Sequence, residues 1–198
     1  MFRVETALGF PYPLIIASRI PIRRFGKWFH SMDNPTSVHQ KLTQGALAGM
    51  IATLPMTIFM RSAWKWLPRR EKYPLPPRQI TRNVLKPSSN LSEPQKKALT
   101  LFLHFAFGTA AGMAYGALEE KIPGHPAVKG LLAGMTVWTG SYLGWIPALG
   151  ILPSAIEHPW RRNVLMIVAH LIWGLTLGAF VRMLSSGLFL RNTYIDLE

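Results

Sequence analysis

Four long stretches of the chain contain no charged side chain, and each is long enough to cross a membrane as an α-helix. They are residues 42–60, 98–118, 130–156 and 163–181, which are 19, 21, 27 and 19 residues long. A helix rises about 1.5 Å per residue, so roughly 20 residues cross a hydrocarbon layer of about 30 Å. The pattern therefore predicts an all-α fold, a polytopic membrane helix bundle with about four transmembrane helices, at about 42–62, 98–118, 128–147 and 163–183.

The polar segments between these stretches predict three parts. Residues 1–41 are expected to form a basic N-terminal arm that lies partly on the membrane surface. Residues 42–184 are expected to form the transmembrane bundle, and residues 185–198 a C-terminal tail. Within the bundle, residues 68–97 form a basic loop whose six prolines exclude a long helix. Because the first span is the most polar, a re-entrant segment is the alternative for residues 42–60.

Charge is scarce, and it lies outside the expected spans. Charged residues make up 16% of the chain, against about a quarter in soluble domains, and the net charge is +13. The lipid bilayer with its anionic headgroups is therefore the expected partner, and nucleic acid is not. Lys and Arg near the span ends favour a cytoplasmic position for the basic loops. The absence of cysteine excludes disulfides and cysteine-bound metals.

Glycine recurs at every fourth position within the spans, and residues four apart share one helix face. Such a face lets two helix backbones approach closely, so we predict tight helix packing, with a ligand slot as the alternative. The spacing also repeats, because His104 and the two glycines after it match His170 and its two glycines. This predicts two helix-pair repeats. The packing glycines are Gly45, Gly49, Gly108, Gly112, Gly130, Gly134, Gly174 and Gly178.

A few polar and aromatic residues are candidates for function. An ionisable side chain inside a span is costly, so His104 and His170 are the main candidates. Structural hydrogen bonding, a proton-linked role and binding of haem b are the alternatives for this pair. No other cofactor and no metal are predicted. The further polar candidates are Glu120, Glu157 and Asn163, and the expected interfacial anchors are Trp64, Trp66, Trp145 and Trp160.

Residues 104–173 resemble the YagU-like family of uncharacterised bacterial inner-membrane proteins. The resemblance implies a multi-pass protein of the bacterial cytoplasmic (inner) membrane, and it implies no activity. The elements that carry it are His104, Tyr115, Glu120, Pro123, Gly130–Gly134, Pro147, Gly150, Pro153, Pro159, Trp160, Asn163, His170 and Trp173.

Motifs for catalysis are missing from the sequence. It contains no phosphate-binding loop, no HExxH, no nucleophile elbow and no pair of carboxylates on one helix. We therefore predict no catalytic residue and no enzyme. The leading hypothesis is an accessory or structural subunit that packs against other membrane protein subunits or itself. The alternatives are a small transporter or proton-linked permeation protein, and a bis-histidine haem-binding protein.

Overall fold

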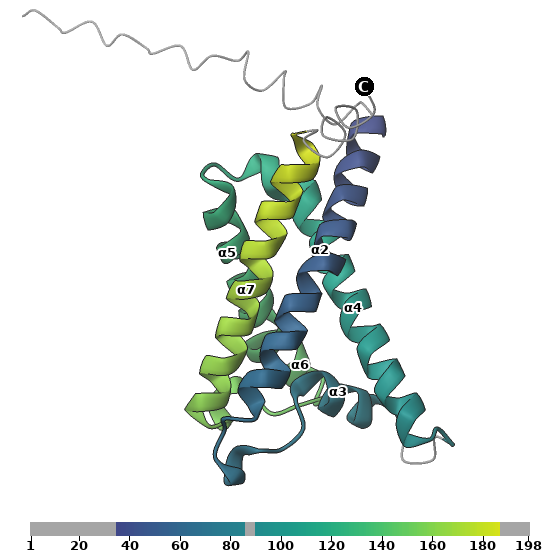
Figure 1. Ribbon diagram of the computed structural model, residues 1–198, viewed down its shortest axis with the longest axis vertical. Helices are drawn as coiled ribbons and strands as arrows, with labels where there is room; N and C mark the ends of the chain where they lie inside the picture. The colour runs from purple at the N-terminus through teal and green to yellow at the C-terminus, as the bar shows by residue number, and fades with distance from the viewer. Residues whose placement is uncertain (1–34, 86–89, 187–198) are drawn as a thin grey trace, which may run out of the picture. The chain divides into compact units, whose positions relative to one another are not determined.

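The computed structural model describes residues 35–85 and 90–186, and this part of the chain contains helices and no strand. Apart from Pro35, the described residues belong to one unit of the chain, Thr36–Glu198. Residues 1–34 of the expected arm and residues 187–198 of the expected tail lie outside the described residues. The main helices are α2 (Pro35–Trp64), α4 (Glu93–Leu118), α5 (Pro126–Thr139) and α7 (Trp160–Ser185) (Figure 1). The short ones are η1 (Arg69–Glu71), α3 (Pro76–Val84), η2 (Glu119–Lys121), the π-helix η3 (Gly140–Trp145), α6 (Ile146–Ala148) and η4 (Ala155–Glu157).

The expectation of an all-α membrane helix bundle is confirmed. Three helical segments are long and apolar enough to cross a membrane: Val38–Trp64, Glu93–Lys121 and Trp160–Ser185. The first of these segments belongs to α2, which is one continuous helix over the expected first span and begins at Pro35, earlier than the expected start at about residue 42.

The expected third span, 128–147, differs from a straight membrane helix. α5 has 14 residues and is followed by the π-helix η3 and the three-residue α6. Two residues explain the interruption. Pro147 has no N–H to donate to the carbonyl one turn earlier, and Gly144 adopts φ −109° and ψ −109°, outside the helical region. The bundle thus contains three long apolar helices, and α5, η3 and α6 form a bent fourth segment at the place of the expected third span.

Glycine faces bring the helices together in two antiparallel pairs. In the α2–α4 pair, a methyl group added to Gly45 would overlap the carbonyl oxygen of Gly112, and one on Gly49 would overlap that of Gly108. In the α5–α7 pair, the carbonyl oxygens of Gly174 and His170 lie in the same way against Gly130 and Gly134. All eight predicted packing glycines therefore lie at helix contacts within this chain, because only hydrogen leaves room for such an approach.

The two pairs follow each other in the same order, as a repeat requires, but their register differs from the expectation. Gly49 lies opposite Gly108, whereas its counterpart Gly134 lies opposite His170. His170 therefore corresponds to Gly108, and not to His104, in the second pair. The second pair is thus shifted by one turn, because sequence spacing alone does not specify which turn lies opposite which.

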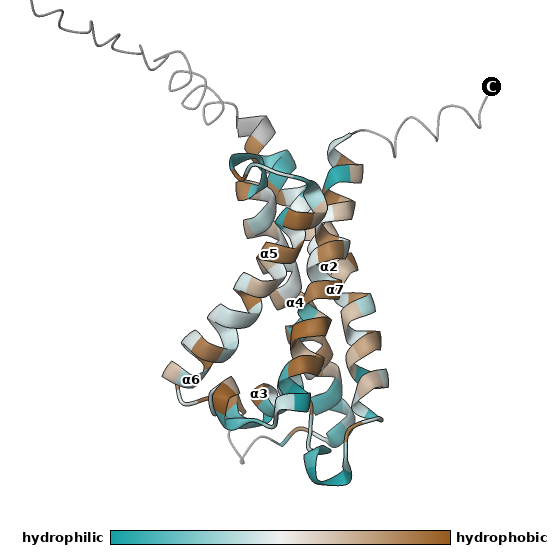
Figure 2. Ribbon diagram, turned by 90° about the vertical axis from the view of Figure 1, so that its left-hand side faces the viewer, coloured by the Kyte–Doolittle hydropathy of each residue, from teal (hydrophilic) through white to brown (hydrophobic). Residues whose placement is uncertain are grey.

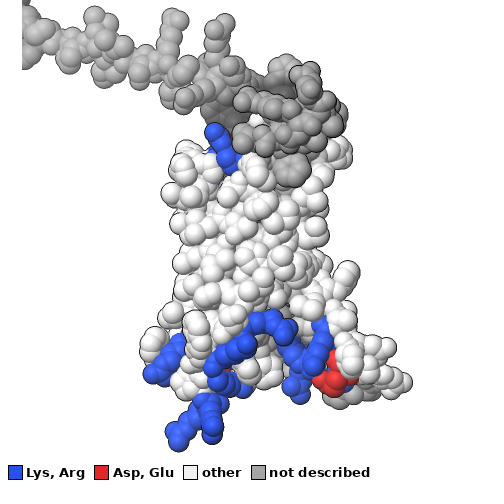
Figure 3. All heavy atoms as spheres, viewed as in Figure 1, with Lys and Arg blue, Asp and Glu red and all other residues white. Residues whose placement is uncertain are grey.

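Charged side chains gather at the two ends of the described unit, with an uncharged band between them (Figure 3). Such a band is the surface that a membrane protein presents to hydrocarbon. One end, which we call the basic end, comprises the C-terminal end of α2, the N-terminal ends of α4 and α7, and the segments between them. Its described basic residues are Arg61, Lys65, Arg69, Arg70, Lys72, Arg78, Arg82, Lys96, Lys97, Arg161 and Arg162.

Candidate functional site

A cavity of about 370 Å³ lies among α2, α3, α4, η3 and α7. Its volume is within the range of small-molecule sites, which begins at about 300 Å³. Most of its wall is apolar, and no Asp, Glu, Lys or Arg of the described chain lines it. The lining residues are Thr53, Met56, Pro77, Ile80, Thr81, Thr100, Leu103, His104, Ala106, Phe107, Gly108, Ala111, Val137, Ser141, Tyr142, Trp145, Ile146, Met166, His170 and Trp173.

The mouth of the cavity lies between α4 and η3. Leu103, Phe107 and Trp145 line the cavity and are also 43%, 44% and 42% exposed on the outer surface. The ring centroids of Phe107 and Trp145 lie 6.2 Å apart across this mouth. All three residues belong to charge-free stretches of the chain. The cavity therefore opens sideways, toward the hydrocarbon of the membrane.

The bend in the fourth segment creates the space. In Figure 2, the run from α5 to α6 leans away from the other long helices toward its lower end, and α3 lies below. Pro77, Ile80 and Thr81 of α3, which share one helical face, close the cavity on that side. π-Helical turns in otherwise α-helical segments occur frequently at functional sites. Here the π-helix carries Ser141 and Tyr142 into the wall.

Both predicted histidines line this cavity. His170 is buried, and its Nδ1–H donates to the carbonyl oxygen of Met166 at 2.7 Å. In the neutral ring, Nε2 of His170 is then left as an acceptor. The edge of the Tyr142 ring packs against the His170 ring, with centroids 6.0 Å apart. His104 has a buried Nε2 atom without a hydrogen-bond partner among the described residues. The structure thus brings the two imidazoles to one site.

The other predicted polar residues lie in the connections and not at the cavity. Glu120 forms an ion pair with Lys41 at 2.7 Å, which joins η2 to the start of α2. Glu157 accepts a hydrogen bond from the backbone N–H of Ser154 at 3.1 Å. Asn163 donates to the carbonyl oxygen of Ala155 at 2.7 Å. Each of these bonds holds a turn or a helix end in place. The described residues include no group of three or more His, Asp or Glu side chains that could hold a metal ion.

Of the predicted tryptophan anchors, one lies at the cavity and the others lie at the basic end. Trp145 lies at the cavity mouth. Trp66 and Trp160 are 84% and 66% exposed at the basic end, and the Arg161 guanidinium lies 5.0 Å from the Trp160 ring. Trp64 donates from Nε1 to the carbonyl oxygen of Tyr73 at 3.1 Å. The amphipathic indole suits such boundary positions, with its ring in an apolar layer and its N–H at a polar group.

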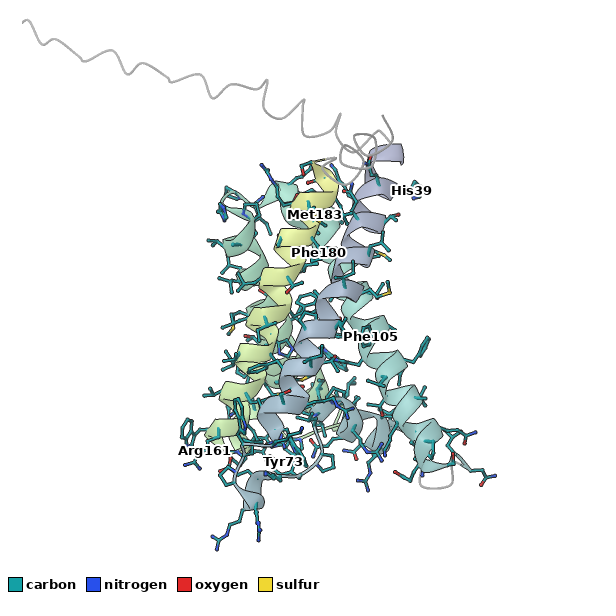
Figure 4. The ribbon with its side chains drawn as sticks, in the orientation of Figure 1. His39, Tyr73, Phe105, Arg161, Phe180 and Met183 are labelled. Carbon is teal, nitrogen blue, oxygen red and sulfur yellow. The ribbon has the colours of Figure 1, made fainter. Side chains whose placement is uncertain are left out.

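A second polar site, the Arg162 cluster, lies below the cavity at the basic end and consists of Arg162, Glu71, Tyr73, Pro74 and His158. Arg162 is only 4% exposed. Its guanidinium donates to the carbonyl oxygens of Tyr73 at 2.9 Å, Pro74 at 3.1 Å and Glu71 at 3.3 Å, and it stacks 3.5 Å from the Tyr73 ring centroid. Figure 4 shows Tyr73 at this end, close to the start of α7. The cluster fixes the segment after α2 against α7.

His158 and Tyr73 complete this cluster as a neutral pair. The Tyr73 hydroxyl and His158 Nδ1 lie 2.8 Å apart and share a hydrogen bond. Burial, together with the nearby Arg162 guanidinium, lowers the pKa of His158. Burial also raises the pKa of Tyr73. Both side chains are therefore uncharged at neutral pH, and Arg162 is the cation of the cluster.

Several residues of these two sites were not anticipated from the sequence. Thr53, Ser141, Tyr142 and Trp173 line the cavity but stand in apolar stretches that resemble any membrane span. The combination of Gly144 with Pro147 signals a helix break, which is the one local clue to the cavity. Arg162 follows another arginine at a helix start, so its burial has no signature in the sequence.

The comparisons with known proteins place the chain among uncharacterised membrane proteins. The model of a family of unknown function (DUF6789) matches residues 39–187. The inner membrane protein YagU of Escherichia coli (strain K12) is 30% identical over 70 residues, which are 35% of this chain and 34% of that protein. The chain thus matches about a third of the length of this curated relative. No solved structure matches. The resemblance to YagU-like proteins is confirmed.

Proposed function

The chain belongs to the family of unknown function DUF6789, and we propose that it is a non-enzymatic integral membrane protein that binds a small apolar molecule inside the bilayer. One observation carries the proposal. A cavity of about 370 Å³ with an apolar wall opens between α4 and η3 onto the uncharged surface band. An apolar molecule dissolved in the membrane would reach it without crossing water.

The glycine faces bear on the competing hypothesis of an accessory subunit. That hypothesis was based on the glycine stripes, on the shortage of charge within the spans and on the long basic segments outside them. Within the described unit these stripes are covered, because α4 occupies the stripe of α2 and α7 occupies that of α5. The accessory role stays a prediction without support from helix packing. The transport and haem hypotheses also stay predictions, and both would use the cavity and its two histidines.

We further propose that the protein resides in the bacterial cytoplasmic membrane with its basic end at the cytoplasmic face. The printed name of the relative, an inner membrane protein, supports the membrane. The gathering of Lys and Arg at one end supports the orientation, because cytoplasmic loops carry an excess of these residues. Anionic headgroups at that face would be the partners of the basic side chains.

A tryptophan at the cavity mouth is expected to abolish binding. Ala106 lines the cavity and is exposed, so the indole of an Ala106→Trp variant would occupy the mouth. We expect affinity for 2-methylnaphthalene and 2-methyl-1,4-naphthoquinone to fall at least about tenfold, which is about 1.4 kcal/mol. The measurement is native mass spectrometry of the protein in detergent, with the bound fraction followed against the mole fraction of probe.

Ala110→Trp is the matched control. Ala110 lies one turn further along α4 and is also exposed, but it does not line the cavity. The Ala110→Trp variant should bind both probes as the wild-type protein does, at one molecule per chain. The proposed pocket function is refuted if neither probe binds saturably to the wild-type protein. It is also refuted if the two variants bind the probes with equal affinity.

A further inference from the structure

The hydrogen-bonding groups in the cavity wall are unevenly used, and this indicates the class of its ligand. Three of the five hydroxyl groups in the wall, those of the threonines, already donate to carbonyl oxygens of their own helices. Thr53 donates to Gly49, Thr81 to Pro77 and Thr100 to Lys96, each at 2.8 Å. A side-chain bond to the carbonyl four residues back uses the only proton of a hydroxyl. These threonines therefore have no proton left for a ligand.

Two side chains that line the cavity each carry a buried nitrogen atom that has no partner among the described residues. Trp173 is only 2% exposed, and its Nε1 atom is buried without an acceptor. The His104 Nε2 atom is buried and unpartnered as well. An indole N–H can only donate, and leaving a buried donor unsatisfied costs roughly 1–3 kcal/mol. A ligand that supplies an acceptor oxygen would remove this cost.

We propose that the ligand is a membrane-soluble carbonyl compound, whose oxygen accepts from Trp173 Nε1–H and whose body fills the apolar cavity. His104 Nε2 is the second contact, as a donor to the same or another carbonyl oxygen. Two kinds of membrane molecule carry such a carbonyl group: a quinone, and an acyl lipid through its ester. This inference rests on the proposed function, because it names the class of molecule that the same pocket takes.

The lack of charged residues around the cavity indicates in addition that the ligand is neutral. No charged residue of the described chain lines the wall, so a carboxylate or an ammonium group would enter without a counter-ion. Burying an unpaired charge is far more costly than burying a carbonyl that gains a hydrogen bond. A neutral molecule with a carbonyl group and no ionised group meets both conditions.

The test compares each carbonyl probe with a hydrocarbon of similar shape. The probe pairs are 2-methyl-1,4-naphthoquinone with 2-methylnaphthalene, and a fatty-acid methyl ester with an alkane of equal chain length. We expect at least one carbonyl probe to bind about tenfold more tightly than its hydrocarbon counterpart, as for one or two buried hydrogen bonds. The carbonyl probe with the larger advantage identifies the source.

Trp173→Phe should remove this advantage, because phenylalanine keeps an aromatic ring and lacks the N–H. Trp138→Phe is the matched control, since Trp138 also has a buried, unpartnered Nε1 but does not line the cavity. If Trp173→Phe does not fold, His104→Leu serves in its place, with an expected loss of several-fold.

The outcomes separate this inference from the proposed function. Hydrocarbons that bind saturably and as tightly as their carbonyl counterparts would overturn the carbonyl inference and leave the pocket intact. An advantage that persists in both Trp173→Phe and His104→Leu would overturn it too. If no probe of either pair binds saturably, the pocket function itself has failed.

Discussion

Replacing Gly112 with alanine is expected to destabilise the protein by about 2 kcal/mol, as overpacking in a filled interior does. The added methyl group would overlap the carbonyl oxygen of Gly45 and crowd the backbone of Gly49. These are backbone atoms, so no side-chain rotation can relieve the overlap, and α2 must move away from α4. Gly174→Ala should act in the same way on α5 and α7, because it meets the carbonyl oxygen of Gly130.

Gly140→Ala is the control that separates packing from helix propensity. Nothing lies within 4 Å of a methyl group added at Gly140. Since alanine favours a helix over glycine by about 1 kcal/mol, this variant should be neutral or slightly stabilised. Unfolding in mixed SDS and non-ionic micelles, followed by circular dichroism, measures all three variants. A Gly112→Ala protein as stable as Gly140→Ala would show that α2 and α4 are not in close contact.

Removal of the buried guanidinium in Arg162→Ala is expected to cost about 3 kcal/mol. The carbonyl oxygens of Glu71 and Pro74 would lose their donor, whereas that of Tyr73 would keep the N–H of Trp64. Each unsatisfied buried acceptor costs roughly 1–3 kcal/mol, so two of them give a total of about 3 kcal/mol. Arg162→Lys should restore little, because an ammonium group cannot reproduce the planar fork of donors or its stacking on Tyr73.

The neighbouring arginine supplies the comparison. Arg161 forms an ion pair with Glu71 at 3.1 Å, but its side chain is 49% exposed. Exposed ion pairs contribute at most about 1 kcal/mol, so Arg161→Ala should have a small effect. The same unfolding assay measures both, with cysteine labelling at Leu67→Cys as a report on the segment after α2. If Arg161→Ala and Arg162→Ala are equally stable, Arg162 does not hold this segment.

The length of the charge-free stretches was sufficient to predict most of the fold. α2, α4 and α7 each cover one such stretch, because a helix without charge is the structure that hydrocarbon accepts. The glycine spacing indicated which helix faces pack closely. It could not tell which turn of α7 meets Gly134, because the contact is made by the backbone carbonyl of His170 and not by a small side chain. Only Gly144 and Pro147 indicated the bend in the fourth segment from the sequence, and they did not indicate its direction.

The candidate site was harder to predict because a cavity arises from several segments at once. His104 and His170 could be identified, since an imidazole in an apolar helix is costly. Trp173 could not, because the sequence does not indicate whether an indole N–H finds an acceptor. The same holds for Arg162, whose burial depends on carbonyl oxygens about 90 residues earlier in the chain.

The central claim is that the cavity between α4 and η3 takes up apolar molecules from the membrane. Photolabelling with an apolar aryl diazirine in reconstituted vesicles, followed by peptide mapping, tests it most directly. The account predicts that label concentrates on Leu103, Phe107 and Trp145 and is displaced there by excess 2-methyl-1,4-naphthoquinone. Leu54 and Leu132, which are 53% and 56% exposed away from the cavity, should carry less label and resist displacement. Even labelling of all five residues, unchanged by the competitor, would contradict the account.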